Sequence, residues 1–418
     1  MKSLECKLAE IKSNPASKQF ILADAKDGDM AFGVLAPGPR HYLATAGNRP
    51  AHFSPEVWSR EEFGHRNLPE FLDIIKEIVN RQLVDIMLMS AGVNERVTIR
   101  EEIFARSPVT PAVRANDTTD IWLVRHGEYP QKASQPFRSA SIDHIQCGHL
   151  DCDRETGEIP GANLGLYSVT FNNDLDRDRE TLRAFAEFRE EAERKQFQYF
   201  LEVFDPNLSG RLEPAKLGAF LNDHIIRSLA GVAAAGRPQF LKIVYHGPRW
   251  MEELAQYDPE LVVGILGGSA GTTYDAFKLI HDAQKYGARV ALFGRKINYA
   301  EHQVAFIEML RAITEGKISP EEAVRAYHGI LQGLKVPPKR PLEEDLQLTD
   351  QSMSYDRKAI VSLTQNPLAP RARVAASAGS NSKDSFWPMT AAGNPDFSRM
   401  TSGQRVAYDQ EHLRKRFD

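Results

Sequence analysis

Three apolar runs in the second half of the chain decide the fold: FQYFLEVF at 197–204, QFLKIVYH at 239–246 and LVVGILGG at 261–268. Each is short, rich in β-branched or aromatic residues and followed by a helical stretch, which is the pattern of parallel βαβ units. Working outward, the same pattern occurs in FILAD at 20–24, VDIMLMS at 84–90, VTPAVRA at 109–115, LGLYSVTF at 164–171 and RVALFG at 289–294. Eight such runs predict an α/β fold in which the strands close into a (β/α)8 TIM barrel.

Helical signals lie between these runs. An apolar stripe at helical spacing predicts an amphipathic helix packed on the barrel, and it consists of Leu68, Phe71, Leu72, Ile75 and Val79. A second helix is expected between Thr273 as its N-cap and Gly287 as its stop, and a third begins with the capping box of Ser319, Pro320 and Glu322.

Composition excludes several classes of protein. Of the 418 residues 42% are hydrophobic and 26% charged, the net charge is −4, and no basic run indicates binding to nucleic acid. No apolar stretch is long enough for a membrane span or a secretory signal, so we expect a cytoplasmic protein with no membrane partner. Cys6, Cys147 and Cys152 are the only cysteines, and we expect free thiols.

Two regions exceed a minimal barrel. Residues 125–161 are rich in Gly, Asp, His and Ser, which predicts a long insertion before the fourth strand. Residues 336–418 contain PPKRP, AASAGSNSKD and AAGNPDFSRM, a composition that buries little core. The sequence therefore predicts a catalytic barrel domain at 1–335 and an extended, partly ordered C-terminal tail.

Lys242 is the most informative residue for function, because it is the single charge in the run PQFLKIVYHGP. An ammonium without a partner is costly to bury, so a lysine inside a barrel tends towards a neutral amine that can attack a carbonyl carbon. A lysine that extends to solvent, or a cation that binds ligand without covalent chemistry, would give the same pattern.

Two carboxylates stand out in the same way. Glu202 is a lone charge in FLEVFD of the preceding strand, and Asp24 ends the first strand, where barrel enzymes place catalytic groups. Burial suits such carboxylates to proton transfer, although a strand-end residue that pairs with a loop lysine is an equally acceptable interpretation.

Two glycine-rich turns follow the last two strands. GILGGSAGTT includes Gly267, Gly268 and Ser269, and FGRKIN includes Gly294 and Arg295. Barrels commonly hold a phosphate between these two loops, where backbone N–H groups and an arginine can donate to it. Glycines that merely permit tight turns are the alternative.

At this point the sequence resembles the class I aldolases of the DeoC/LacD type, which include tagatose-bisphosphate aldolases and archaeal-type fructose-bisphosphate aldolases. The resemblance lies in FLEVFD, FLKIVYHGP, VVGILGGSAGTTYDAFKLIHDAQKYGA and ALFGRKIN, over about 197–313. It implies that Lys242 is the Schiff-base lysine, that Glu202 and Asp24 transfer protons, and that Ser269 and Arg295 bind phosphate. Tyr167 resembles the tyrosine acid of the archaeal-type branch.

One departure from the family concerns the fourth strand, where LGLYSVTFNND lacks the lysine of tagatose-bisphosphate aldolases. This puts a second phosphate site in doubt. The cations that could serve such a site are Lys26, Arg40, Arg114 and Arg249.

Two motifs suggest metals but fit poorly. His144, Cys147, His149 and Cys152 are close in sequence, yet their spacing matches no common zinc site. DPNLSGRLEPAK at 205–216 resembles a calcium loop, but its twelfth position is Lys216 where a glutamate is needed. We expect no metal at either place.

The sequence thus favours a lyase of carbohydrate metabolism that cleaves or forms a phosphorylated ketose through an imine at Lys242, with a three-carbon ketone phosphate as product. No cofactor is required, because the protonated imine accepts the electrons. A phosphosugar is the expected partner, and a homo-oligomer is compatible with the sequence. A non-cleaving phosphosugar enzyme (an isomerase, an epimerase or a transaldolase-like enzyme) and a non-catalytic phosphosugar-binding barrel remain alternatives.

Overall fold

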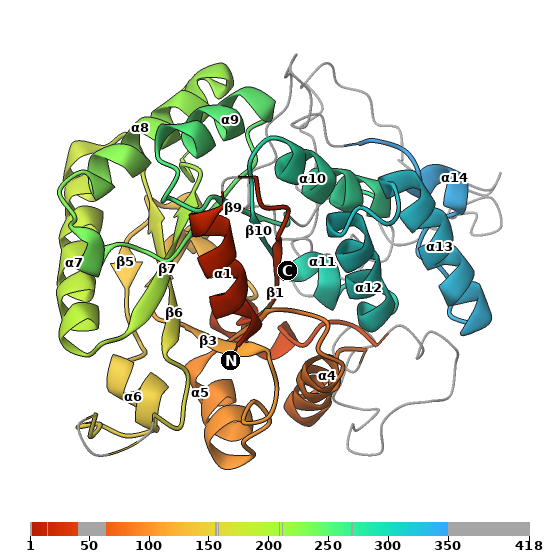
Figure 1. The fold of residues 1–418 in the computed structure, drawn as a ribbon, viewed down its shortest axis with the longest axis horizontal. Coiled ribbons are helices and arrows are strands. Elements are labelled where there is room, and N and C mark those ends of the chain that lie inside the picture. Colours follow the sequence, from red (N-terminus) through yellow and green to blue (C-terminus); the bar gives the residue numbers. More distant parts are fainter. Residues whose placement is uncertain are drawn as a thin grey trace, which may run out of the picture. The chain divides into compact units, whose positions relative to one another are not determined.

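Eight parallel strands close into a barrel in the computed structural model (Figure 1), which describes residues 2–349 except 15, 41–63, 155–156, 158, 209, 211 and 269–270. The strands are β1 (Ile21–Lys26), β2 (Ile86–Met89), β3 (Thr110–Arg114), β6 (Leu164–Thr170), β7 (Gln198–Phe204), β8 (Leu241–Ile243), β9 (Gly264–Leu266) and β10 (Val290–Phe293). They follow one another around the barrel in chain order, and β10 pairs with β1. The predicted (β/α)8 fold is confirmed.

Helices cover the outside of the barrel. The longer ones are α1 (Ser3–Ser13), α4 (Leu68–Asn80), α7 (Leu175–Arg194), α8 (Leu217–Leu229), α9 (Pro248–Tyr257), α10 (Thr273–Lys285), α12 (Gln303–Thr314) and α13 (Pro320–Gly333). The short ones are α2 (Asp29–Phe32), α5 (Ala91–Asn94), α6 (Ile142–Cys147), α11 (Arg295–Asn298), α14 (Leu342–Asp345), a π-helical turn at Glu95–Arg100, and 3₁₀ turns at Gly33–Leu35, Thr119–Ile121, Tyr129–Gln131, Pro214–Lys216 and Ala234–Gly236. Among the described residues, no helix is long and apolar enough to cross a membrane.

Local sequence explains the helices that were predicted. In α4 the apolar stripe is buried against the barrel, and Asn67 with Glu70 forms a capping box at its start. The capping box of Ser319 and Glu322 begins α13. The N-cap of α10 is Thr272, one residue before the predicted Thr273, because its hydroxyl accepts from the N–H of Asp275.

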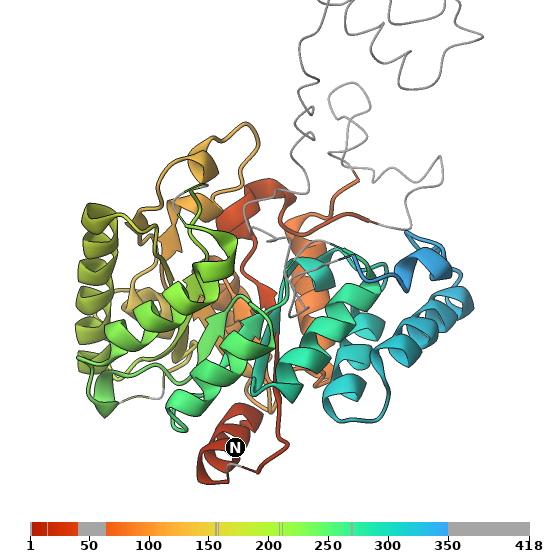
Figure 2. The same cartoon turned by 90° about the horizontal axis from the view of Figure 1, so that it is seen from above.

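One end of the barrel is closed by α1, as Figure 2 shows. Its residues Leu4, Leu8 and Ile11 belong to the same buried cluster as the side chains that point inward from the starts of the strands, such as Ile21 and Phe240. The interior at that end is therefore packed and apolar. The carboxyl ends of the strands lie at the opposite end, where barrels place their sites.

The predicted insertion lies between β3 and β6. It contains a two-stranded antiparallel pair, β4 (Asp117–Thr118) with β5 (Pro136–Phe137), and then α6. Helix α6 occupies the place of the third barrel helix, so the insertion is mainly an enlarged loop at the carboxyl end of β3.

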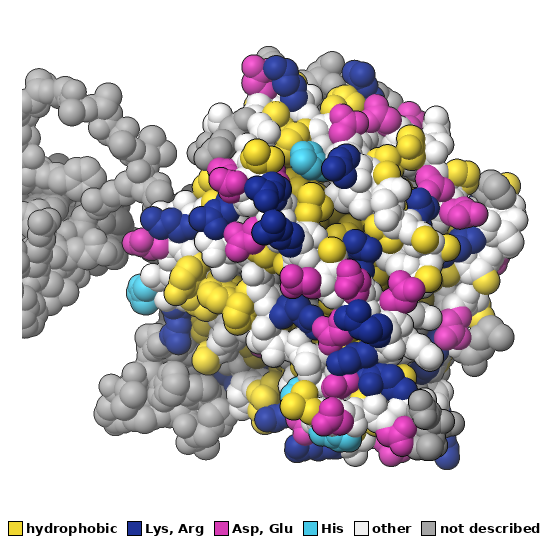
Figure 3. Space-filling model, turned by 90° about the vertical axis from the view of Figure 1, so that its left-hand side faces the viewer, with side chains coloured by type: hydrophobic (Ala, Val, Ile, Leu, Met, Phe, Trp, Pro, Cys, Tyr) yellow, Lys and Arg dark blue, Asp and Glu magenta, His cyan; other side chains and the backbone are white. Residues whose placement is uncertain are grey.

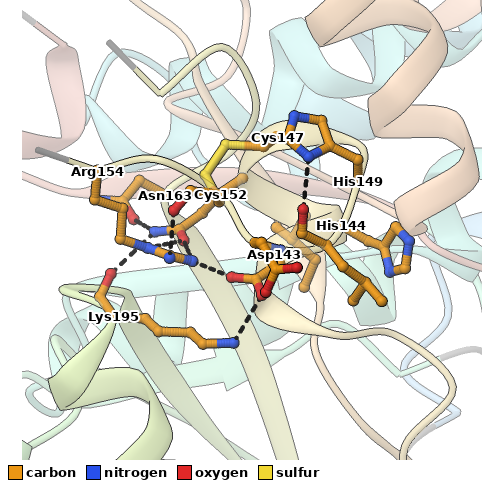
Figure 4. Close-up of a disulfide and its surroundings, with 12 residues drawn as sticks. Asp143, His144, Cys147, His149, Cys152, Arg154, Asn163 and Lys195 are labelled. Atoms are coloured by element: carbon orange, nitrogen blue, oxygen red, sulfur yellow. Dashed lines mark hydrogen bonds and ion pairs between the residues drawn. A yellow bond between two sulfur atoms is a disulfide. The ribbon is translucent and has the colours of Figure 1, made fainter. Parts of the chain in front are cut away.

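The cysteines differ from expectation. Cys147 at the end of α6 forms a disulfide with Cys152 (Figure 4), so the prediction of free thiols was wrong for this pair, while Cys6 is free and exposed. His144 contacts Ser141 Oγ through Nδ1 at 2.8 Å, and His149 contacts the carbonyl of Leu150 at 2.7 Å. Among the described residues, no group of three or more His, Cys, Asp and Glu side chains is arranged to hold a metal ion.

The chain continues past α13 and returns to the barrel. The N–H of Thr273 donates to Asp345 Oδ1 at 2.7 Å, the hydroxyl of Thr272 donates to the carbonyl of Gln347 at 2.7 Å, and the N–H of Thr349 donates to Asp275 Oδ1 at 2.8 Å. The first part of the predicted tail therefore packs against the start of α10. The rest, 350–418, lies outside the described residues, and the domain boundary at 335 stays a prediction.

The side of the barrel covered by α7 and α8 carries charges of both signs, interspersed with one another (Figure 3). Some of them pair along the helix surface, such as Lys195 with Glu191 at 3.0 Å and Arg194 with Glu190 at 3.7 Å. Arg194 and Glu190 are exposed, and an exposed ion pair of this kind contributes little to stability.

Candidate active site

Three neighbouring strands bring their polar side chains to one level inside the barrel. Ser168 of β6 is in register with Glu202 of β7, and Glu202 is in register with Lys242 of β8. Lys242 Nζ lies 2.5 Å from Glu202 Oε1, and Ser168 Oγ donates to Glu202 Oε2 at 2.7 Å. Lys242 is 6% exposed and Glu202 is 1% exposed, so neither is the isolated charge that the sequence indicated; each is the other's partner.

Arg114 of β3 connects this row to a second carboxylate. Its Nε donates to Asp27 Oδ2 at 2.6 Å, its Nη1 donates to Ser168 Oγ at 2.9 Å, and its Nη2 lies 3.4 Å from Glu202 Oε2. Burial acts to lower the pKa of Arg114, but the nearby carboxylates of Asp27, Glu202 and Asp117 outweigh it and raise the pKa above its ordinary value. The guanidinium therefore stays charged and holds both carboxylates in place.

A cavity of about 120 Å³ opens at this level. Lys242, Glu202, Arg114 and Asp27 line it together with both glycine turns, represented by Gly267, Gly268, Gly294 and Arg295. Apolar side chains form much of the remaining wall, among them Phe32, Leu123, Phe204 and Leu266. A small ligand in this cavity can thus contact the amine, the carboxylates and the two turns at once.

The first glycine turn needs its glycines for two different reasons. A Cβ on Gly267 would lie 2.3 Å from the ring of Phe293, so only glycine allows β9 and β10 to pack here. Gly268 has a φ of 59°, in the left-handed region that favours glycine, and a Cβ there would meet nothing within 4 Å. Ser269, the third predicted phosphate ligand of this turn, lies outside the described residues.

Arg295 follows the second turn and is half-buried at the cavity wall. Burial lowers its pKa to about 10, while Tyr299 and Glu202 act in the opposite direction. At neutral pH the guanidinium is still protonated.

The prediction for Asp24 was wrong. Asp24 and Lys26 lie on the outer face of β1, where Lys26 Nζ is 2.7 Å from Asp24 Oδ2 and both side chains are fully buried. Burial raises the pKa of Asp24, opposed by Lys26. Side chains alternate along a strand, so Asp27, three positions after Asp24, faces the opposite way, towards the interior. Asp27, and not Asp24, therefore lines the cavity.

Tyr167 is also misplaced for catalysis. It precedes Ser168, and since Ser168 faces the interior, Tyr167 faces the helix layer. Its ring stacks on Phe188 of α7 with centroids 4.3 Å apart and contacts Phe185 at 5.3 Å. Burial raises the pKa of Tyr167, and its hydroxyl has no hydrogen-bond partner in the described part of the chain. It is a core residue.

Of the four cations that the sequence offered for a second phosphate site, one lines the cavity and three do not. Arg114 is in the cavity. Lys26 pairs with Asp24, Arg40 forms an ion pair with Glu70 at the start of α4, and Arg249 stacks on Trp250 at 4.5 Å. The last three therefore do not contribute to this cavity.

Several polar residues near the site were not singled out from the sequence. Asn116 fixes the backbone of Ser168 through hydrogen bonds of 2.8 and 2.6 Å. Asp205, read as part of a polar turn, contacts His246 Nε2 at 2.8 Å at the carboxyl ends of β7 and β8. Ser168 could have been found as a polar residue inside the apolar run LGLYSVTF at 164–171.

Fold and geometry together define a class: a (β/α)8 barrel with a buried lysine–glutamate pair and two glycine turns around one cavity. No protein-family model matches the chain, and no curated protein matches it. Among solved structures it is similar to an archaeal fructose 1,6-bisphosphate aldolase, at 13% identity and a TM-score of 0.50 over 75% of this chain and 100% of that one.

Two further solved structures are similar. A Schiff base forming fructose-1,6-bisphosphate aldolase matches at 14% identity and a TM-score of 0.49, over 75% of this chain and 100% of that one. A Corynebacterium glutamicum protein matches at 15% identity and a TM-score of 0.45, over 76% of this chain and 94% of that one. At these identities the likeness concerns the fold.

Proposed function

We propose that this protein is a class I aldolase that forms an imine between Lys242 and the ketone of a phosphorylated ketose. The observation that carries the proposal is the Lys242–Glu202 pair, 2.5 Å apart, in a cavity that both glycine turns also line. Similarity of fold to fructose 1,6-bisphosphate aldolases supports it.

Imine formation requires a neutral amine. Glu202 is placed to take a proton from the Lys242 ammonium, and the amine then attacks the ketone carbon. Protonation of the resulting carbinolamine hydroxyl releases water and leaves a protonated imine on Nζ. Glu202 can return the proton it accepted in this step, so one carboxylate serves both directions.

Cleavage requires a base for the hydroxyl whose carbon becomes the aldehyde. Asp27, in the place that the sequence prediction gave to Asp24, lines the same cavity and fits this role. As the hydroxyl loses its proton, the carbon–carbon bond breaks and its electron pair passes to the imine nitrogen, giving an enamine. Protonation at carbon and hydrolysis then release a three-carbon ketone phosphate and regenerate Lys242.

The phosphate would orient the ketone. Gly267, Gly268, Gly294 and Arg295 line the cavity, and the Arg295 guanidinium is the group there that can donate to a phosphate. Anchoring the substrate at a second point converts attack by Lys242 into an intramolecular step, which accounts for much of the acceleration in such reactions.

A substrate screen tests the proposal. Ketose phosphates, and dihydroxyacetone phosphate with a series of aldehydes, are offered to the wild type and to Lys242→Met, which has similar length and no amine. Cleavage or condensation by the wild type alone is the expected result. Equal turnover by both proteins, or none with any ketose phosphate, would rule out the assigned chemistry.

A further inference from the structure

A second cavity, of about 230 Å³, lies beside the first. Its walls include Gly271 of the first glycine turn, Lys296 of α11, and Lys339 and Arg340 of the segment between α13 and α14. Arg295 and Tyr299 line both cavities.

Cations in this second cavity outnumber the carboxylates that line it. Arg295, Lys296, Lys339 and Arg340 are the cations, and Glu301 and Asp345 are the carboxylates. Lys296 Nζ donates to the carbonyls of Gly271 and Thr272 at 2.8 and 3.0 Å, which are neutral acceptors.

Both carboxylates also accept hydrogen bonds from groups other than these side-chain cations. Glu301 accepts from the Tyr327 hydroxyl at 3.1 Å and from the backbone N–H of Lys339 at 2.7 Å. Asp345 accepts from the N–H of Thr273 at 2.7 Å and contacts His328 Nε2 at 2.9 Å. The lining nevertheless holds four side-chain cations against two carboxylates, so it carries a net positive charge.

The pKa of Lys296 is lowered in a way that favours binding of an anion in this cavity. Burial lowers the pKa of Lys296 to about 8; Asp275 and Asp345 oppose this effect, whereas Arg340 and Lys339 add to it. Burial also lowers the pKa of Lys339; Glu301 opposes this effect and Arg340 adds to it. Clustered cations that lower one another's pKa are stabilised when an anion binds among them.

We propose that this second cavity binds a phosphoryl group, held by Arg340 and Lys339 from the segment after α13 and by Lys296 from α11. Several N–H donors in a confined space, with little competing negative charge, are what a phosphate or phosphate monoester requires. The assignment rests on the cavity and its charges and is independent of the chemistry at Lys242.

A binding measurement on the full chain tests this site. Inorganic phosphate is titrated calorimetrically into the wild type, Arg340→Glu and Lys339→Ala. Arg340 and Lys339 are exposed and do not line the candidate catalytic cavity, so the fold should persist. Arg325→Ala, an exposed arginine of α13, is the matched control.

The wild type and the control are expected to bind phosphate equally, and Arg340→Glu to bind at this site about tenfold more weakly or not at all. Lys339→Ala should weaken binding in the same direction. Superimposable isotherms for the wild type and both variants, with unchanged thermal unfolding, would overturn the proposal, as would a wild type that binds no phosphate.

Kinetics then separate the two sources of the phosphoryl group. If it is the second phosphate of the substrate, Arg340→Glu raises KM for a ketose bisphosphate and leaves KM for the monophosphate unchanged. If it belongs to a separate molecule, both KM values stay as in the wild type while phosphate binding is lost. Borohydride trapping at Lys242 is unaffected in either case, so failure of this site and failure of the aldolase proposal are distinguishable.

Discussion

At the scale of single residues, the proposed chemistry depends on one proton moving between Lys242 and Glu202. Replacing Glu202 by Gln keeps the shape and removes the acceptor, so the ammonium loses the partner 2.5 Å away that takes its proton. We expect turnover to fall by about 10²–10⁴-fold, the range for loss of a general acid–base. Single-turnover rates measure this, with Lys242→Met as the zero point; a Glu202→Gln protein as fast as the wild type contradicts the role of Glu202.

Tyr167→Phe tests whether Tyr167, which packs against α7 and not in the cavity, takes part in the reaction. Since the Tyr167 ring packs on α7 and its buried hydroxyl has no partner among the described residues, removal of that oxygen should leave turnover unchanged. Stability should be equal or higher by up to about 1 kcal/mol, because a desolvated hydroxyl is lost. Chemical denaturation and initial rates measure both effects. A large fall in turnover would place the tyrosine in the reaction after all.

Asp117, beside Arg114 and 3% exposed, should make stability depend on pH. Burial raises its pKa from 3.8 to about 6, opposed by Arg114. Between pH 3.8 and about 6, Asp117 is protonated in the folded protein but ionised in the unfolded chain. The stability of the folded protein therefore falls as the pH rises through this range, and the full cost of burying the charged carboxylate is present above about pH 6.

Asp117→Asn removes that cost and keeps the hydrogen bond from the Thr118 N–H. We expect the variant to be more stable than the wild type by about 1–3 kcal/mol at pH 7.5. The difference should shrink as the pH falls from 6 to 4. Urea unfolding at several pH values measures it, and a difference that is constant over this range, or of opposite sign, would show that Asp117 is not desolvated in this way.

Strand facing decided which of the predicted site residues lie in the cavity. Lys242 and Glu202 were identified because a charge inside an apolar run is conspicuous, and both face the cavity. Asp24 and Tyr167 were equally conspicuous but face the helices, because strand alternation fixes only which residues share a face and not which face is inward. Arg114 escaped notice as a central residue because its partners, Asp27 and Glu202, are far away in sequence.

At the scale of elements, period and capping signals located the helices and strands well. All eight strand runs became barrel strands in the predicted order, although β8 and β9 are reduced to Leu241–Ile243 and Gly264–Leu266. Strand ends depend on pairing with neighbours, which apolar runs do not encode. Likewise, the return of 342–349 to the start of α10 is a tertiary contact with no local signature.

That return contact predicts a measurable effect on stability. Asp345 accepts a hydrogen bond from the first-turn N–H of Thr273, so Asp345→Ala leaves a donor at the start of α10 without its acceptor. Loss of a helix cap typically costs about 1 kcal/mol, within 0.5–2. Chemical denaturation measures the effect, and Glu344→Ala, on the same short helix but exposed, is the control. Equal stability of the two variants would mean that Asp345 does not cap α10.

At the scale of the whole molecule, the packed apolar end of the barrel and the candidate site lie at opposite ends of the strands. Helix α1 and the apolar interior close one end, and the candidate site occupies the carboxyl ends of the strands. Barrel closure is what brings Asp27, which follows the first strand, together with Arg114 of the third and Lys242 of the sixth in one cavity. The sequence predicted this architecture from its repeating pattern, but the charge balance of the two cavities follows only from the closed structure.

Borohydride trapping tests the central claim most directly. The full chain is mixed with dihydroxyacetone phosphate and sodium borohydride, digested, and analysed by peptide mass spectrometry. Imine formation predicts an irreversible adduct on the peptide that contains Lys242, absent when the ketone phosphate is omitted and absent in Lys242→Met. A ketone phosphate that binds without any adduct on Lys242, or adducts spread evenly over surface lysines, would contradict the account.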